Sequence, residues 1–335
     1  MGTYAVAFAA ALVATLLATP LARAAALRFG AMDLPAERKA HSDPIPYLGG
    51  LAMILAFVVA VGSGGLARGL QGAYPQALAI LGGGLVLAAV GLWDDLKVVP
   101  GWVKVPLEIA LGTLLFAAGV RAQLFGSWPL DLLLTLAWVV GITNAVNYMD
   151  NMDGLTAGAS AIASAYFLAL AGISGQFLVA GLAAALCGCC LGFLWYNRPP
   201  ARIFMGDTGS LFLGYLLAAI GLELSFDNIA RVTFFVPVAV MAVPILDALL
   251  VSISRIRGGV SPIRPGRDHI SHRLVSIGFP SKAAVGLLYF ASAATGWVAL
   301  VIAFSPPLTA YLLMGWLVVV GTFLGLLLLK VETDR

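Results

Sequence analysis

Long runs of hydrophobic residues alternate with short polar segments along almost the whole chain. Uncharged runs of about 17 to 25 residues can cross a bilayer as helices, because a helix pairs its own backbone amides and carbonyls. The pattern predicts about eleven membrane spans, at residues 3–22, 47–66, 76–93, 103–120, 127–143, 155–173, 177–196, 210–224, 232–251, 283–304 and 308–329.

The composition supports this interpretation. Hydrophobic residues make up 61% of the 335 residues and charged residues only 10%, whereas soluble domains carry roughly a quarter charged residues. We therefore expect an all-α polytopic membrane protein, with residues 1–335 forming one membrane domain. The net charge of +3 then reflects membrane topology, and no nucleic acid partner is expected.

The distribution of lysine and arginine predicts the orientation. If the N-terminus lies outside, sixteen of the nineteen basic residues fall in inner loops and the C-terminal tail, as expected for a chain whose positive loops stay cytoplasmic. The first span is followed, not preceded, by basic residues, so we expect a retained anchor although Ala22-Arg23-Ala24 resembles a signal-peptide cleavage site. We expect a multi-pass plasma-membrane protein, with the polar loops described next on the cytoplasmic side.

The most informative stretch is NAVNYMDNMDGLTAG, from Asn144 to Gly158, at the inner end of the fifth span. Asn147, Asp150 and Asp153 are spaced by three residues, so on a helical turn they lie on adjoining faces. Carboxylate and amide oxygens are the ligands that Mg²⁺ prefers. An ordinary Asn- and Asp-rich helix cap would explain one acid, but not two acids with three amides.

Two further acidic segments fall on the same predicted face. Asp94 and Asp95 end the third span, where a cation or a shared proton would relieve their repulsion; a helix ended by solvated acids is the simpler alternative. Residues 206–210, GDTGS, lead into the eighth span, and the amides of such a helix start can bind phosphate.

Other polar residues admit simpler explanations. Glu108 lies inside the fourth span, and Lys104 one turn earlier is its expected ion-pair partner. Asp247 in the ninth span either pairs with an inner arginine or lines the site. Three cysteines, Cys187, Cys189 and Cys190, lie in the seventh span, where a helix contact is a better explanation than a thiolate metal site.

Histidines occur in two inner loops. His41 lies in the first of them, ERKAHSDPIPYLGG, and is a candidate for the wall of a site. His269 and His272 lie in the longest inner loop beside several arginines, including Arg267. Such a loop fits an anionic membrane surface, and its histidines and arginines also suit pyrophosphate binding.

Taken together, five segments resemble the polyprenyl-phosphate N-acetylhexosamine-1-phosphate transferase superfamily, glycosyltransferase family 4, in its WecA/TagO-like branch. The resemblance covers about residues 38–274 and rests on HSDPIPYLGG, the Asp94-Asp95 pair, NAVNYMDNMDGLTAG, PPARIFMGDTGSLFLG and the histidine loop. The loop departs from the branch at Gly266 and Ser271. The MraY translocases are more distant relatives, and their HHHFE-like string is absent here.

The resemblance implies transfer of a sugar 1-phosphate, with GlcNAc-1-phosphate expected, from a UDP-sugar to an undecaprenyl-type polyprenyl phosphate. UMP would be released, and Mg²⁺, or Mn²⁺ in its place, would be required. A homodimer is a further expectation. The reaction would begin the membrane stage of cell-envelope polysaccharide synthesis.

The resemblance also implies roles for individual residues. Asp207 would be the principal metal ligand with Asn147 beside it, and Asp94 and Asp95 would position the metal complex, Asp94 also being a candidate to take the proton of the lipid phosphate. Asp150 and Phe204 would face the uracil, and Asp153 and His41 would line the site. The histidine loop would touch the diphosphate or sugar through Arg267, His269 and His272, with His269 among the catalytic residues.

Three other functions remain open on the sequence. An MraY-like phospho-muramoyl-pentapeptide transferase is the nearest alternative. An ion-coupled transporter also has acids and broken helices, but its acids lie near the bilayer midplane, whereas the acids here lie at inner loop ends. A non-catalytic scaffold leaves the clustered acids unexplained.

Overall fold

The structure is a computed structural model that describes residues 2–33, 44–63, 73–97, 99–226, 230–261 and 266–331. Within these ranges the fold is almost entirely helical, which confirms the predicted all-α class. The helices are α1 (Gly2–Phe29), α2 (Gly49–Gly62), α3 (Tyr74–Leu96), α4 (Gly101–Ala117), α5 (Trp128–Met149), α6 (Leu155–Ile173), α7 (Phe177–Asn197), α8 (Gly206–Glu223), α9 (Ala230–Val240), α10 (Ala242–Arg257), α11 (Ile270–Ser276), α12 (Ser281–Ala303) and α13 (Pro307–Leu328).

A helix overlaps each of the eleven predicted spans, but fewer are long enough to cross a bilayer alone. In the described ranges seven helices are long and apolar enough to do so, or eight if the bent pair α9 and α10 is one span. The helices α2 and α4 contain only 14 and 17 residues. The fold is therefore a multi-span membrane protein whose described helices support seven or eight candidate spans.

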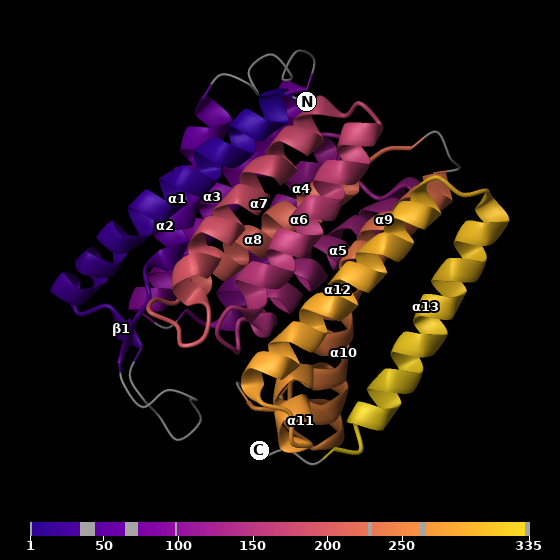
Figure 1. The fold of residues 1–335 in the computed structure, drawn as a ribbon. Helices are drawn as coiled ribbons and strands as arrows, with labels where there is room; N and C mark the ends of the chain where they lie inside the picture. Colours follow the sequence, from indigo (N-terminus) through magenta and orange to yellow (C-terminus); the bar gives the residue numbers. More distant parts are fainter. Residues whose placement is uncertain are drawn as a thin grey trace.

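The predicted ninth span is broken into two helices. Its parts, Val232–Val240 and Ala242–Arg257, meet at an angle of 73°. Pro244 explains the break, because proline has no N–H to donate to the carbonyl four residues earlier. The bend directs α10 toward the end of the bundle where α11 lies (Figure 1).

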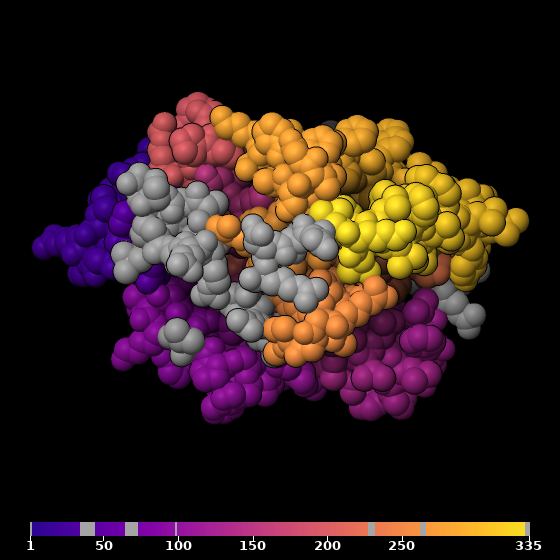
Figure 2. All heavy atoms as spheres, turned by 90° about the horizontal axis from the view of Figure 1, so that it is seen from below, coloured from indigo at the N-terminus to yellow at the C-terminus, as the bar shows by residue number. Residues whose placement is uncertain are grey.

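The core is built around α8, which packs against α2, α3 and α5 and is buried from Thr208 to Leu222. A helix that is apolar on all sides is either buried in the protein or surrounded by lipid, and α8 is buried. Helix α7 lies between α1 and α6 and is buried from Leu178 to Cys190. Viewed from one end, α1 (indigo) and α13 (yellow) lie toward opposite edges of the molecule (Figure 2).

The three cysteines on α7 are free and buried. The thiols of Cys187 and Cys189 point to the carbonyl oxygens of Ala161 on α6 and Met53 on α2, at 3.6 and 3.4 Å. This confirms the helix contact that the sequence favoured.

Glycines allow the ends of α2, α3 and α8 to approach closely. A Cβ on Gly91 of α3 would lie 2.4 Å from the carbonyl oxygen of Asp207, and one on Gly50 of α2 would lie 2.4 Å from the amide nitrogen of Gly209. Neither position accommodates a larger residue without moving the backbone. The glycines therefore set the position of the first turn of α8.

The strands are minor elements. β1 (Met32–Asp33) pairs antiparallel with β2 (Ile45–Pro46), and Tyr47 forms a parallel bridge to Phe204. The bridge attaches the segment before α2 to the segment before α8.

Candidate active site

The first turn of α8 is held by Asp95. Its carboxylate accepts hydrogen bonds from the amides of Asp207 and Thr208, at 2.8 and 3.0 Å, and from the Thr208 hydroxyl at 2.5 Å. Gly206 has a φ of +67°, and a Cβ there would lie 2.5 Å from Asp95. The GDTGS segment was predicted to offer its amides to a phosphate. That prediction is wrong for the amides of Asp207 and Thr208, since both already donate hydrogen bonds to Asp95.

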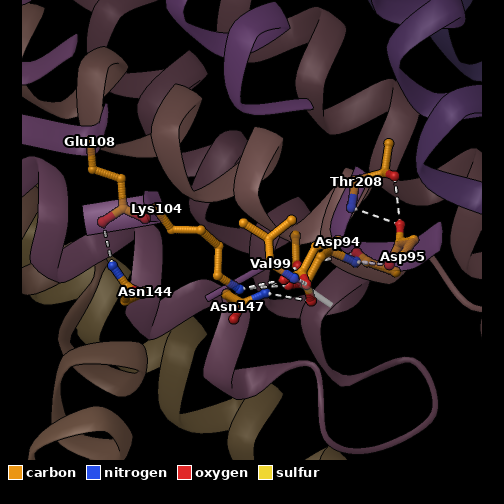
Figure 3. A network of polar contacts seen from close by, with 11 residues as sticks. Asp94, Asp95, Val99, Lys104, Glu108, Asn144, Asn147 and Thr208 are labelled. Carbon is orange, nitrogen blue, oxygen red and sulfur yellow. Dashed lines mark hydrogen bonds and ion pairs between the residues drawn. The ribbon is translucent and has the colours of Figure 1, made fainter. Parts of the chain in front are cut away.

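Asp94 and Asp207 contact the same lysine, Lys104, whose side chain extends toward Asp94 in Figure 3. Lys104 Nζ on α4 is 2.5 Å from Asp94 Oδ2 and 3.1 Å from Asp207 Oδ2. Asp94 also accepts the Val99 amide at 2.6 Å. One cation thus neutralises carboxylates from two helices that are far apart in sequence.

Glu108 does not form the ion pair with Lys104 that the sequence spacing favoured. Its Oε2 instead accepts a hydrogen bond from Asn144 Nδ2 at 2.6 Å (Figure 3). The expected pair is wrong because Asp94 and Asp207 both lie within reach of the lysine. Glu108 is fully buried, and its Oε1 has no hydrogen-bond partner.

Asn147 joins the same cluster from α5. Its Nδ2 donates to Asp207 Oδ1 at 3.0 Å and lies 2.8 Å from Ser210 Oγ. The structure thus brings together Asn147 and Asp207, the two predicted metal ligands, with Asp94 and Asp95.

The turn between α5 and α6 carries the other two predicted acids. Burial, and after it the negative charge of Asp207, raises the pKa of Asp150 to about 7. Asp150 therefore lies close enough to Asp207 for their charges to interact. Asp153 has a structural contact, since its Oδ2 accepts the Ala201 amide at 2.8 Å and fixes the segment that precedes α8.

The histidine loop is organised by Asp247, whose role the sequence left open. His269 Nδ1 is 2.8 Å from Asp247 Oδ2, and the Ile270 amide donates to Asp247 Oδ1 at 2.7 Å. Asp247 therefore pairs with His269. It also accepts the first amide of α11.

His272 lies 6.1 Å from His269, measured between ring centroids. Burial, and after it the neighbouring His269 and Arg267, lowers the pKa of His272 to about 4. Its ring is therefore neutral near pH 7. The side chain of Arg267 is half-buried beside this pair.

One hydrogen bond connects the histidine loop to the acidic turn. Ser271 Oγ donates to Asn151 Oδ1 at 2.6 Å. Ser271 is one of the two positions at which the loop departs from the branch pattern. Within the described ranges no hydrogen bond joins His269 or His272 to Asp94 or Asp207.

Two predicted site residues remain. Phe204 is half-buried, its amide donates to the Pro46 carbonyl at 2.9 Å, and its carbonyl accepts the Gly49 amide at 3.0 Å. The backbone therefore fixes its place just before α8, and no contact tests its predicted uracil stacking. His41 lies outside the described residues.

The donor set fits a hard cation. Mg²⁺ usually takes one or two carboxylates and leaves its other positions to water and substrate phosphates. Asp207 and Asp94 supply carboxylate oxygens close to Lys104 Nζ. Asn147 adds an amide oxygen that makes no hydrogen bond in this cluster. In the described ranges no group of three His, Cys, Asp or Glu residues is spaced to hold a metal, so the substrates would have to complete the coordination.

Sequence reasoning missed several residues of the site. Asn197 accepts the Gly154 amide and donates to the Ile203 carbonyl, both at 3.0 Å. Tyr289 donates to the Gly154 carbonyl at 2.6 Å. Both hold the acidic turn from helices distant in sequence, and only their polar character within apolar runs could have drawn attention to them.

Known proteins resemble this chain closely. Residues 77–225 match the model of glycosyl transferase family 4. A probable undecaprenyl-phosphate N-acetylglucosaminyl 1-phosphate transferase of Bacillus subtilis is 32% identical, over 85% of this chain and 80% of its own length. A decaprenyl-phosphate N-acetylglucosaminephosphotransferase of Mycolicibacterium smegmatis is 35% identical, over 91% and 83%.

A third relative is more distant. The undecaprenyl-phosphate alpha-N-acetylglucosaminyl 1-phosphate transferase of Escherichia coli K12 is 28% identical, over 81% of this chain and 76% of its own length.

The region that matches the family model includes Asp94, Asp95, Asn147, Asp150 and Asp207. On these matches the chain belongs to glycosyl transferase family 4, in the group of polyprenyl-phosphate N-acetylglucosamine-1-phosphate transferases.

Proposed function

We propose that the protein transfers N-acetylglucosamine 1-phosphate from UDP-GlcNAc to a polyprenyl phosphate and releases UMP. The observation that carries the proposal is the cluster in which Lys104 lies between Asp94 and Asp207. The names of the relatives supply the acceptor and the sugar.

The cluster suits a reaction between two anions. An oxygen of the lipid phosphate attacks the β-phosphorus of the nucleotide, a new P–O bond forms, and the bond from the β-phosphorus to the α–β bridging oxygen breaks. UMP leaves with that oxygen, and the sugar stays attached to the transferred phosphate. Bringing the anions together requires fixed positive charge, which a divalent cation and basic side chains supply in phosphoryl transfer.

The residues divide into binding and positioning roles. Asp207 and Asn147 would hold Mg²⁺, or Mn²⁺ in its place, whose chemistry is to neutralise the phosphate oxygens. Lys104 contacts both Asp94 and Asp207 and holds the two side chains in place, and Asp95 holds the first turn of α8. The second ionisation of a phosphate monoester lies near pH 6, so the acceptor hardly needs Asp94 as a base at pH 7.

The histidine loop is proposed to bind the donor. His269, oriented by Asp247, and Arg267 present donors that suit a diphosphate or a sugar hydroxyl. His272 is neutral near pH 7 in the protein without substrate. In that state it would form hydrogen bonds to the donor as an uncharged ring. Asp150 and Phe204 are proposed to face the uracil.

The site is proposed to face the cytoplasm of a bacterial cell. The bias of basic residues toward one set of loops supports this orientation, and UDP-sugars are cytoplasmic substrates. About eleven spans and a homodimer are proposed with it.

The test is UMP release by the purified protein in vesicles that contain polyprenyl phosphate. We expect release with UDP-GlcNAc and Mg²⁺, no release without the lipid, and no release after Asp207→Asn. Glu223→Gln, a matched change at the opposite end of α8, should turn over normally. Release with UDP-MurNAc-pentapeptide but not UDP-GlcNAc would assign the donor of the MraY branch instead.

A further inference from the structure

A groove between α7 and α12 lies outside the acidic cluster. It has a volume of about 330 Å³ and is lined by Leu191, Leu194 and Trp195 on α7 and by Val285 and Tyr289 on α12. Both helices are long and apolar enough to cross a membrane. The groove therefore opens where lipid chains surround the protein.

Positive charge is concentrated at one end of the groove. Arg198 follows the last residue of α7, and Lys282 lies in the first turn of α12. The Arg198 guanidinium lies 4.1 Å from the centre of the Trp195 ring, a contact that holds a cation beside an aromatic ring at the edge of the apolar region. Among the residues that the structure describes, no acid lines the groove.

The groove is adjacent to the acidic turn but separated from it by protein. Tyr289 lines the groove, and its hydroxyl donates to the Gly154 carbonyl at 2.6 Å. A Cβ on Gly154 would lie 3.3 Å from that hydroxyl and 3.6 Å from Arg198 Cα, and a Cβ on Gly158 would overlap Tyr289. Glycine at both positions allows the tyrosine to reach the turn that carries Asp150 and Asp153.

From these contacts we infer that the groove binds an anionic diacyl phospholipid of the surrounding leaflet, with its phosphate at Arg198 and Lys282 and an acyl chain along α7 and α12. The charge pattern matches such a lipid, because the cations lie at the membrane surface and the remaining lining is apolar. The acceptor phosphate is assigned to the acidic cluster, none of whose residues Asp94, Lys104 and Asp207 lines the groove. Occupancy would hold Tyr289, and through it the turn, in place.

The test counts lipids bound to the purified full chain, by native mass spectrometry after extraction from vesicles of equal parts phosphatidylglycerol and phosphatidylcholine. The wild type should retain more phosphatidylglycerol than phosphatidylcholine. Arg198→Gln with Lys282→Gln should reduce that preference roughly tenfold or more, since each basic residue near an anionic surface contributes about fivefold. The matched control, Arg28→Gln with Lys330→Gln, removes two exposed cations elsewhere and should retain the preference.

Equal retention of phosphatidylglycerol by the groove variant and the wild type would overturn the inference. With polyprenyl phosphate added to the same vesicles, loss of retained polyprenyl phosphate instead of phospholipid in the groove variant would overturn it too. The effect on turnover rests on the proposed function: UMP release should be faster in phosphatidylglycerol than in phosphatidylcholine vesicles for the wild type, and equal for the groove variant. Absence of UMP release in every vesicle would refute the proposed function, whereas the lipid count would still decide this inference.

Discussion

Lys104 Nζ lies 2.5 Å from Asp94 Oδ2, although the two residues belong to different helices, and the same nitrogen reaches Asp207 at 3.1 Å. The lysine side chain is only 18% exposed. A single cation therefore joins α3, α4 and α8 at the point where the chemistry is proposed.

Replacing this cation is expected to disable the site. Lys104→Met leaves two close carboxylates without their partner, and breaking a partly buried ion pair in this way costs about 2 kcal/mol or more. Transfer should fall by roughly 100-fold, and the thermal midpoint in EDTA should fall more than the midpoint in Mg²⁺. Lys97→Met, which removes an exposed lysine just after α3, should change neither; equal losses in both variants would contradict the assignment.

The packing of α3 against α8 gives a second prediction. Gly91→Ala places a methyl group against the Asp207 carbonyl, and overpacking of this kind costs about 1 to 3 kcal/mol. The first turn of α8 should shift, so that both thermal stability and transfer decrease.

The same helix provides the control. A Cβ on Gly82 would meet nothing within 4 Å, so Gly82→Ala should leave stability unchanged or raise it slightly through helix propensity. If both alanine variants behaved alike in thermal unfolding, the close approach at Gly91 would not be what positions Asp207.

The pKa of Asp150 predicts a pH dependence of stability. Its value in the folded protein, about 7, lies above the ordinary value of 3.8, so the folded state holds this proton more tightly than the unfolded state does. The stability from this group is fully present below about pH 4 and is lost as pH rises through 7.

Asp150→Asn removes the titrating group. Measured in EDTA, the unfolding free energy of the variant should therefore gain on that of the wild type between pH 5 and pH 8, by on the order of 2 kcal/mol. A difference that stays constant over this range would show that Asp150 is ionised throughout.

The Asp247 and His269 pair predicts a defined tautomer. A carboxylate only accepts hydrogen bonds, so Nδ1 of His269 must carry the proton. The chain has three histidines, which makes their ring ¹⁵N resonances assignable by single substitutions. The resonance of His269 should show a protonated Nδ1 at pH 7 in the wild type.

The same pair predicts a catalytic effect. Asp247→Asn should alter the Nδ1 signal of His269 and lower transfer about tenfold to a hundredfold, as expected when the orientation of a catalytic histidine is lost. Unchanged transfer with an altered signal would remove His269 from the reaction.

Much of the fold follows from the hydrophobic pattern. A helix lies at every predicted span, because a polypeptide in lipid must pair its own amides. The convergence of Asp94, Asp150 and Asp207 was also predictable, since each lies at the inner end of a predicted span: the first two follow a span that runs inward and the third precedes one that runs outward.

The partners of individual side chains were less predictable. Spacing along a helix favoured Glu108 for Lys104, but Asp207 reaches the lysine from 103 residues away. That contact depends on how α3 and α5 pack against both α4 and α8. The role of Asp247 depended in the same way on the bend before α10. In the sequence, nothing indicated a partner for the amides of the GDTGS segment. The packing of α3 against α8 brings Asp95 to the amides of Asp207 and Thr208.

The central claim is that the bond broken in the nucleotide lies between the β-phosphorus and the bridging oxygen. UDP-GlcNAc labelled with ³²P at the β-phosphate, incubated with the reconstituted protein, Mg²⁺ and polyprenyl phosphate, tests it directly. The account predicts that the label moves into the lipid while unlabelled UMP appears, and that Asp207→Asn abolishes both. Label released as UDP, with unlabelled sugar on the lipid, would contradict it.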